Sequence, residues 1–143
     1  MGKKRIVKTE DGAEKETKVS SVASVSKKKV EKGLLYVEST YNNTKLILTD
    51  IKGNVLATSS AGSLGFKGAK KGTPFAAAKV GETLGAKASV IGIKEISVLI
   101  KGVGSGRESG IRGFISKGIN LLSIKDITPV PHNGPKPKKP RRV

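Results

Sequence analysis

The chain has 143 residues, no cysteine, and a formal net charge of +17 that results from 28 Lys and Arg against 11 Asp and Glu. The missing cysteines exclude disulfides, cysteine zinc sites and thiol chemistry, and they fit a reducing compartment. The positive charge favours an anionic partner, and nucleic acid is the first candidate. No apolar run approaches transmembrane length and none follows the N-terminus, so we expect neither a membrane partner nor a secretory signal.

Charge and apolar residues divide the chain into three segments. Residues 1–33 carry ten basic and five acidic side chains in a low-complexity sequence, which predicts a flexible extension. Residues 34–127 hold nearly all of the apolar periodicity and form the predicted body, long enough for one small core. Residues 128–143 hold five of the six prolines and five Lys and Arg but no acid, which predicts a basic, extended tail.

The body begins with three predicted strands. Leu34–Tyr41 and Val55–Ser59 are rich in β-forming residues, and Thr44–Thr49 alternates apolar with polar side chains. The turn signals Asn42–Asn43 and Lys52–Asn54 separate these runs. The pattern predicts an antiparallel meander.

A stretch rich in glycine and lysine follows at residues 59–74 and lacks both helical and strand periodicity, which predicts a loop. Thr73 and Pro74 then predict the start of a helix, since a hydroxyl N-cap precedes a proline at the first helical position. The buried stripe of this helix recurs every four residues. It consists of Ala76, Val80, Leu84 and Ala88.

The second half repeats the alternation of strand and helix. Lys94–Lys101 predicts a strand, Arg107–Lys117 a helix that stops at Gly118, and Leu121–Ile127 the last strand. Glycines within the second helix weaken it by roughly 1 kcal/mol each relative to alanine. The order is β-β-β-α-β-α-β. It predicts an α/β fold of ribonuclease H-like, three-layer architecture with a mixed five-stranded sheet.

Catalysis is a weaker interpretation of the same sequence. A nuclease on this fold needs several carboxylates that converge on metal ions, and Glu38, Glu82 and Asp126 loosely mimic such a set. Solvent-exposed charge is the better interpretation of the acids. His132 is the single histidine, so a histidine pair for a metal or a proton relay is excluded. We therefore expect no catalytic residue, no metal, no cofactor and no small-molecule substrate.

Two basic glycine loops favour RNA. In the first, small residues surround three lysines and Phe66, which could stack on a base or fill the core. In the second, glycines precede the helix that carries Arg107 and Arg112, where backbone N–H groups could approach phosphate. The second loop lacks the Gly-Lys-Ser/Thr of a nucleotide P-loop. Both loops lie at strand-to-helix junctions, so we expect them to share one edge of the sheet and to form one surface with the tail.

Four motifs of the chain resemble those of one family in combination and order. They are STYNNT (39–44), SSAGSLGFKGAKKGTPFAA (59–77), KGVGSGRESGIR (101–112) and DITPVPHNG (126–134), followed by a basic end. Residues 34–143 thereby resemble the eleventh protein of the small ribosomal subunit in its bacterial-type form. The resemblance implies a structural, cytoplasmic ribosomal protein that binds and bridges small-subunit rRNA helices on the platform. It also implies a nearby cleft where messenger RNA pairs with rRNA, and the small-subunit proteins numbered seven and eighteen as neighbours.

Loop chemistry and this resemblance together predict a set of RNA contacts. They are Asn42, Asn43, Ser59, Ser60, Phe66, Lys67, Gly68, Lys70, Lys71, Thr73, Lys101, Gly104, Gly106, Arg107, Arg112, His132, Asn133, Lys136, Lys138, Lys139, Arg141 and Arg142. The chain departs from the family pattern at Val103, where proline is usual, at Gly110, where alanine is usual, and from Pro135 onward. The pair Asn133-Gly134 could form isoaspartate. The alternatives to the ribosomal interpretation are a metal-dependent nuclease and a generic RNA-binding module.

Overall fold

The computed structural model describes residues 30–142. Its elements, in chain order, are the strands β1 (Lys32–Ser39), β2 (Thr44–Asp50) and β3 (Val55–Ser60), the 3-10 helix η1 (Gly68–Gly72), the helix α1 (Pro74–Ile91), β4 (Glu95–Gly102), α2 (Arg107–Ile115) and β5 (Asn120–Asp126). The predicted order β-β-β-α-β-α-β is confirmed. Most of the predicted flexible extension lies outside the described residues, and residues 32 and 33 already belong to β1.

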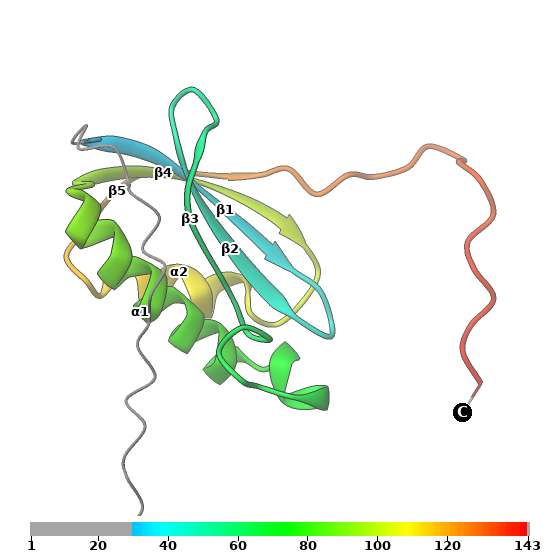
Figure 1. Ribbon diagram of the computed structural model, residues 1–143. Helices are drawn as coiled ribbons and strands as arrows, with labels where there is room; N and C mark the ends of the chain where they lie inside the picture. The colour runs from blue at the N-terminus through cyan, green and yellow to red at the C-terminus, as the bar shows by residue number, and fades with distance from the viewer. Residues whose placement is uncertain (1–29, 143) are drawn as a thin grey trace, which may run out of the picture.

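The five strands form one mixed sheet in the order β3-β2-β1-β4-β5. The pairs β1–β2 and β2–β3 are antiparallel, and the pairs β1–β4 and β4–β5 are parallel. The predicted meander and mixed sheet are therefore confirmed. Because β1, β3, β4 and β5 run in the same direction, their carboxyl ends lie together at one end of the sheet, next to the start of β2 (Figure 1).

Both helices cover the same face of the sheet, so the predicted three-layer arrangement is wrong and the described body has two layers. Helix α1 packs on β2 and β3, α2 packs on β1 and β2, and the helices contact each other (Figure 1). The reason lies in the connections. The crossovers from β3 to β4 and from β4 to β5 run in the same direction across the sheet, and such connections are right-handed. Both helices consequently pack on one face.

The core lies between the helices and alternate residues of the strands. Leu35 and Val37 of β1 are buried, whereas their neighbours Leu34 and Tyr36 face the uncovered side and are partly exposed. All four residues of the predicted α1 stripe are fully buried. Strand β5 forms an edge and is exposed along its whole length. Helical spacing thus identified the buried face of α1.

The start of α1 follows the predicted chemistry. The Thr73 side chain accepts a hydrogen bond from the Ala76 N–H at 3.3 Å, and Pro74 occupies the first helical position. Gly92 ends the helix in the left-handed region at φ 97°. Helix η1 was missed, and its residues 68–72 were predicted as loop. A single 3-10 turn is too short to leave a periodic sequence pattern.

Glycines bring α1 and α2 into backbone contact. A β-carbon at Gly81 would lie 2.2 Å from the carbonyl oxygen of Gly110, and one at Gly113 would lie 2.4 Å from the carbonyl oxygen of Ala78. A β-carbon at Gly110 would instead lie 3.5 Å from the nearest atom, a methyl of Leu46, which is an ordinary contact. The two glycines of α2 therefore differ: the interhelical contact requires Gly113 but leaves room for a methyl at Gly110.

This difference predicts opposite effects for two matched substitutions. Gly110→Ala should raise the free energy of unfolding by about 0.5–1 kcal/mol, because alanine loses less backbone freedom in a helix. Gly113→Ala should lower it by about 1–3 kcal/mol, because α1 must move to admit the methyl. Urea unfolding followed by circular dichroism measures both values. Equal effects of the two substitutions would contradict the packing argument.

Candidate nucleic-acid interface

Three connecting segments meet at the carboxyl ends of the strands, and together they are called the loop end below. They are the β1–β2 turn (residues 40–43), the β3–α1 loop (residues 61–73, which includes η1) and the β4–α2 loop (residues 103–106). A β-carbon at Gly72 would lie 2.1 Å from the Tyr41 carbonyl oxygen, and one at Gly104 would lie 2.3 Å from that of Thr40. The Ser105 hydroxyl donates to the Gly72 carbonyl at 2.7 Å. The predicted convergence of the two glycine loops is confirmed.

The glycines of the second loop serve the protein's own packing. Gly102 adopts φ 108°, and its β-carbon would lie 2.0 Å from the Ser39 carbonyl oxygen. A β-carbon at Gly106 would lie 2.2 Å from the Thr44 hydroxyl oxygen. Gly104 and Gly106 are both buried. The close approach that these glycines permit is therefore to strands β1 and β2 of the same chain, and the tight βα turn is the better interpretation of this motif.

The first loop presents the cations. Lys67 and Lys70 are exposed and Lys71 is half-buried. Within residues 30–142, none of the three forms an ion pair. Gly68, between them, is exposed in the left-handed region at φ 60°. The Thr73 hydroxyl donates to the Lys70 carbonyl at 2.7 Å, so this predicted contact residue also closes η1.

Phe66 fills the core edge rather than facing solvent. It is half-buried, packs against the hydrophobic core and meets the ring of Phe75 edge to face at 6.2 Å. Of the two interpretations open for Phe66, stacking on a base or filling the core, this geometry favours the second.

The remaining predicted contacts of the body differ in exposure. Asn42 and Lys101 are exposed, and Asn43 is half-buried. Ser59 is only 5% exposed, on β3. Ser60 is held in a local turn, where its side chain accepts from the Ser63 N–H at 3.2 Å and its own N–H donates to the Ser63 hydroxyl at 3.0 Å. Ser59 is therefore buried and Ser60 is bound to Ser63, whereas the side chains of Asn42 and Lys101 are exposed.

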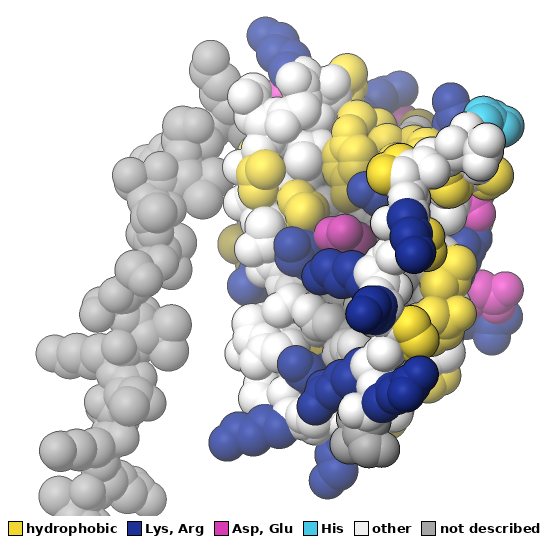
Figure 2. Space-filling view, turned by 90° about the vertical axis from the view of Figure 1, so that its right-hand side faces the viewer, with side chains coloured by type: hydrophobic (Ala, Val, Ile, Leu, Met, Phe, Trp, Pro, Cys, Tyr) yellow, Lys and Arg dark blue, Asp and Glu magenta, His cyan; other side chains and the backbone are white. Residues whose placement is uncertain are grey.

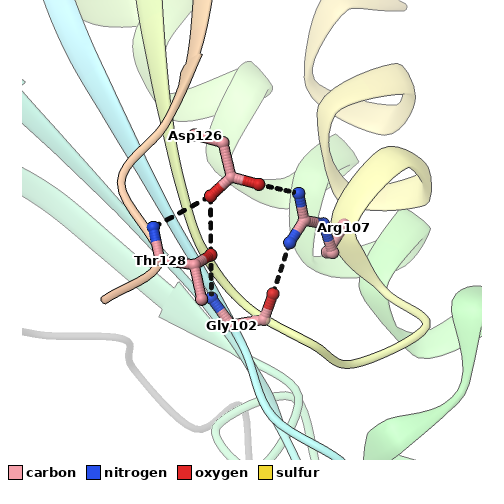
Figure 3. A network of polar contacts seen from close by, with 4 residues as sticks. All are labelled: Gly102, Arg107, Asp126 and Thr128. Atoms are coloured by element: carbon pink, nitrogen blue, oxygen red, sulfur yellow. Dashed lines mark hydrogen bonds and ion pairs between the residues drawn. The ribbon is translucent and has the colours of Figure 1, made fainter. Parts of the chain in front are cut away.

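The two arginines of α2 have different surroundings. The Arg107 guanidinium pairs with the Asp126 carboxylate and donates to the Gly102 carbonyl (Figure 3). Hydrogen bonds from Thr128, and then the Arg107 guanidinium, hold the pKa of Asp126 well below its usual range. Arg112 is 82% exposed, and its partner Glu108, at 3.3 Å, is 80% exposed. The Arg112 guanidinium is thus the more accessible of the two.

The tail leaves the body at the loop end. Residues 129–142, which include all of the predicted tail contacts, are exposed, and the tail runs away from the sheet and then bends downward (Figure 1). Asn133 adopts φ 52°, in the left-handed region. Figure 2, which faces this end of the molecule, shows Lys and Arg side chains gathered over its lower half. Tail and loops thus contribute positive charge to the same end.

Two exposed aromatic residues at the loop end were missed. Tyr41 is 77% exposed in the β1–β2 turn, and Phe75 is 64% exposed in the first turn of α1, with the Lys79 ammonium 5.8 Å from its ring centre. The sequence pattern predicts Tyr41 as the end of a strand, whereas β1 ends at Ser39. Their positions in the sequence were the available signal. Tyr41 lies beside the turn signal Asn42–Asn43, and Phe75 directly follows the proline that starts a helix, so both lie at the ends of elements and away from the core.

The carboxylates of the nuclease interpretation are each matched with a cation. Glu38 lies 3.8 Å from Lys45, and Glu82 lies 3.0 Å from Lys79. Asp126 pairs with Arg107, as described above. Between residues 30 and 142, no group of three or more His, Asp or Glu side chains is placed to hold a metal ion. In the same range, no helix has the length and apolar character needed to cross a bilayer.

A compact α/β body with a convergent basic loop end and a cationic tail is the architecture of a small RNA-binding protein. The comparison with protein families agrees: residues 33–142 match the family model described as Ribosomal protein S11. Because this match covers most of the chain, the chain belongs to that family. The protein is a structural, rRNA-binding component of the small ribosomal subunit and not an enzyme. The alternatives of a nuclease and a generic RNA-binding module are both wrong.

The contact between η1 and the β1–β2 turn generates a prediction. Gly72→Ala should separate the two segments, because its methyl would meet the Tyr41 carbonyl at 2.1 Å. Gly62→Ala, in the same loop, is the matched control, since the nearest atom to its methyl would be the Lys71 Cδ at 3.8 Å. Amide hydrogen exchange of residues 40–43 should accelerate in the first variant only. Unchanged exchange in Gly72→Ala would disprove the contact.

Proposed function

We propose that the loop end and the tail together form the rRNA-binding surface of this protein. The observation that carries the proposal is the convergence of three segments that expose Asn42, Lys67 and Lys70 and contain no acidic residue, at the end from which the cationic tail departs. Body and tail act as two parts. The body of residues 34–127 supplies a fixed set of contacts, and the tail of residues 128–143 supplies an extended one.

Phosphate neutralisation provides most of the affinity in this proposal. Lys67, Lys70 and Arg112 on the body, and the five Lys and Arg of the tail, displace counterions from the RNA. The exposed Asn42 amide adds hydrogen bonds, and the Tyr41 and Phe75 rings offer faces on which unpaired bases stack. The protein then recognises folded rRNA through its shape and backbone, with little direct sequence readout.

We further propose a location within the subunit. Family membership supports a place on the platform, near the cleft where messenger RNA pairs with rRNA, with the small-subunit proteins numbered seven and eighteen as neighbours in cytoplasmic ribosomes. The sheet order β3-β2-β1-β4-β5, with an antiparallel meander followed by two parallel crossovers, supports assignment to the ribonuclease H-like architecture. In this protein the architecture serves as a scaffold for binding.

Crosslinking within assembled small subunits tests this location. A photoreactive group on Lys67 or Lys70 should crosslink to rRNA near its 3′ end, and the same group on exposed Lys87 of α1 should give a different set of nucleotides. Mapping the crosslinked nucleotides and proteins by sequencing and mass spectrometry provides the readout. Crosslinks from the loop end only to rRNA far from the 3′ end would refute the platform location, while leaving rRNA binding itself supported.

Removal of the tail tests its contact with phosphate. Deletion of Pro135–Val143 removes five cationic side chains. Affinity for rRNA should fall, and the log-log dependence of affinity on salt should become shallower by roughly 4, the slope expected for five neutralised phosphates. Filter binding at several salt concentrations measures both quantities. A slope that stays the same would show that the tail does not touch phosphate.

A further inference from the structure

A closed ring of hydrogen bonds fixes the start of the tail, and it is called the clasp below. Asp126 is the last residue of β5, and its carboxylate accepts from the Thr128 N–H at 2.9 Å and from the Thr128 hydroxyl at 2.6 Å. That hydroxyl in turn accepts from the Gly102 N–H at 3.2 Å. Arg107 completes the ring through the Asp126 carboxylate and the Gly102 carbonyl (Figure 3). The Gly102 N–H donates and its carbonyl accepts within the clasp, and the Thr128 hydroxyl acts as both donor and acceptor.

The clasp joins three elements that are distant in sequence. Gly102 ends β4, Arg107 begins α2, and Thr128 is the second residue after β5. Gly102 packs closely against the end of β1, since a β-carbon at this position would lie 2.0 Å from the Ser39 carbonyl oxygen. The Ile127 N–H extends the attachment with a hydrogen bond to the Ile100 carbonyl at 2.8 Å. The chain therefore leaves the sheet in a direction set by β4 and α2.

The surroundings of Arg107 disfavour a direct contact with RNA. Its side chain is 31% exposed, and the charge that would attract a phosphate is already opposed by Asp126. Arg112, on the same helix, is 82% exposed and shares only a solvent-exposed pair with Glu108. Since exposed pairs are weak and easily exchanged, Arg112 is free to meet a phosphate at little cost.

We propose that Arg107 is a positioning residue, which holds the root of the tail through Asp126 and Thr128 and leaves phosphate contact to other side chains. Prolines at positions 129 and 131 restrict themselves and the residues before them to extended backbone, so a direction fixed at Thr128 persists into the tail. Pre-orientation of this kind lowers the ordering cost of binding. The proposal rests on the proposed function, because it assumes that the tail binds rRNA.

Asp126→Ala distinguishes a positioning role of Arg107 from a phosphate-binding role, because the two roles predict opposite changes in affinity for rRNA. The probe is a full-length transcript of small-subunit rRNA, titrated with the full-length chain. If the clasp orients the tail, affinity falls by about threefold to tenfold although a negative charge has been removed. An increase in affinity would overturn the proposal, since it would mean that Asp126 restrains an arginine that binds phosphate. Thr128→Val, which removes only the hydroxyl, should weaken binding in the same direction, and it provides the test if Asp126→Ala does not fold.

Salt dependence provides an independent test. Arg107→Ala should weaken binding and leave the log-log salt slope unchanged, because the same phosphates are neutralised in the complex. Arg112→Ala is the matched control, and it should reduce the slope by about 1 if that side chain contacts phosphate. A slope reduced by about 1 in Arg107→Ala would overturn the positioning role.

The tail deletion tests whether the clasp acts through the tail, and it distinguishes failure of the clasp proposal from failure of the proposed RNA binding by the tail. In a chain that lacks Pro135–Val143, Arg107→Ala should have a smaller effect than in the full-length chain, because the cationic part of the tail that it orients is gone. An equal loss of affinity with and without the tail would overturn the clasp, while the tail's own contact with RNA stands. If deletion of the tail alone changes neither affinity nor slope, then the proposed function of the tail fails, and the clasp's role in binding fails with it.

Discussion

The backbone of residues 39–41, at the end of the central strand β1, is the constraint on which the loop end depends. Gly72, Gly102 and Gly104 approach its carbonyl oxygens so closely that none of the three positions has room for a β-carbon. Strand β1 is itself paired on both sides, with β2 and β4. Loops, which are usually the most variable part of a protein, are thus held here against a strand that is paired on both sides.

This constraint determines how charge is distributed. The glycines occupy the positions next to β1, while Lys67 and Lys70 of the first loop are exposed and form no ion pair with any other residue in the described range. Asp126 lies at the same end, but Arg107 and Thr128 occupy its carboxylate. Acidic charge at this end is therefore opposed within the protein, and the exposed cations remain available to an anionic partner.

Local sequence patterns predicted most of the fold and only part of the site. Thr73-Pro74 identified the start of α1, because a cap and a proline act within one turn. The number of layers was missed, since it depends on strand order, which periodicity does not contain. The glycine loop before α2 predicts Arg107 as an RNA contact, but the sequence does not show its pairing with Asp126, which is nineteen positions away. Phe66 has two open interpretations in the sequence, and its contact with Phe75 distinguishes them. Exposure and pairing are properties of the folded chain.

The two parts of the surface suit different kinds of contact. Loops packed on β1 place their cations at fixed separations, so they suit one particular arrangement of phosphates. The tail is fixed only at its root, and its exposed residues 129–142 reach roughly 40 Å when extended at about 3.1 Å per residue. That reach exceeds the width of a single RNA helix. A chain that binds one rRNA helix with its loop end can therefore contact a second helix with its tail.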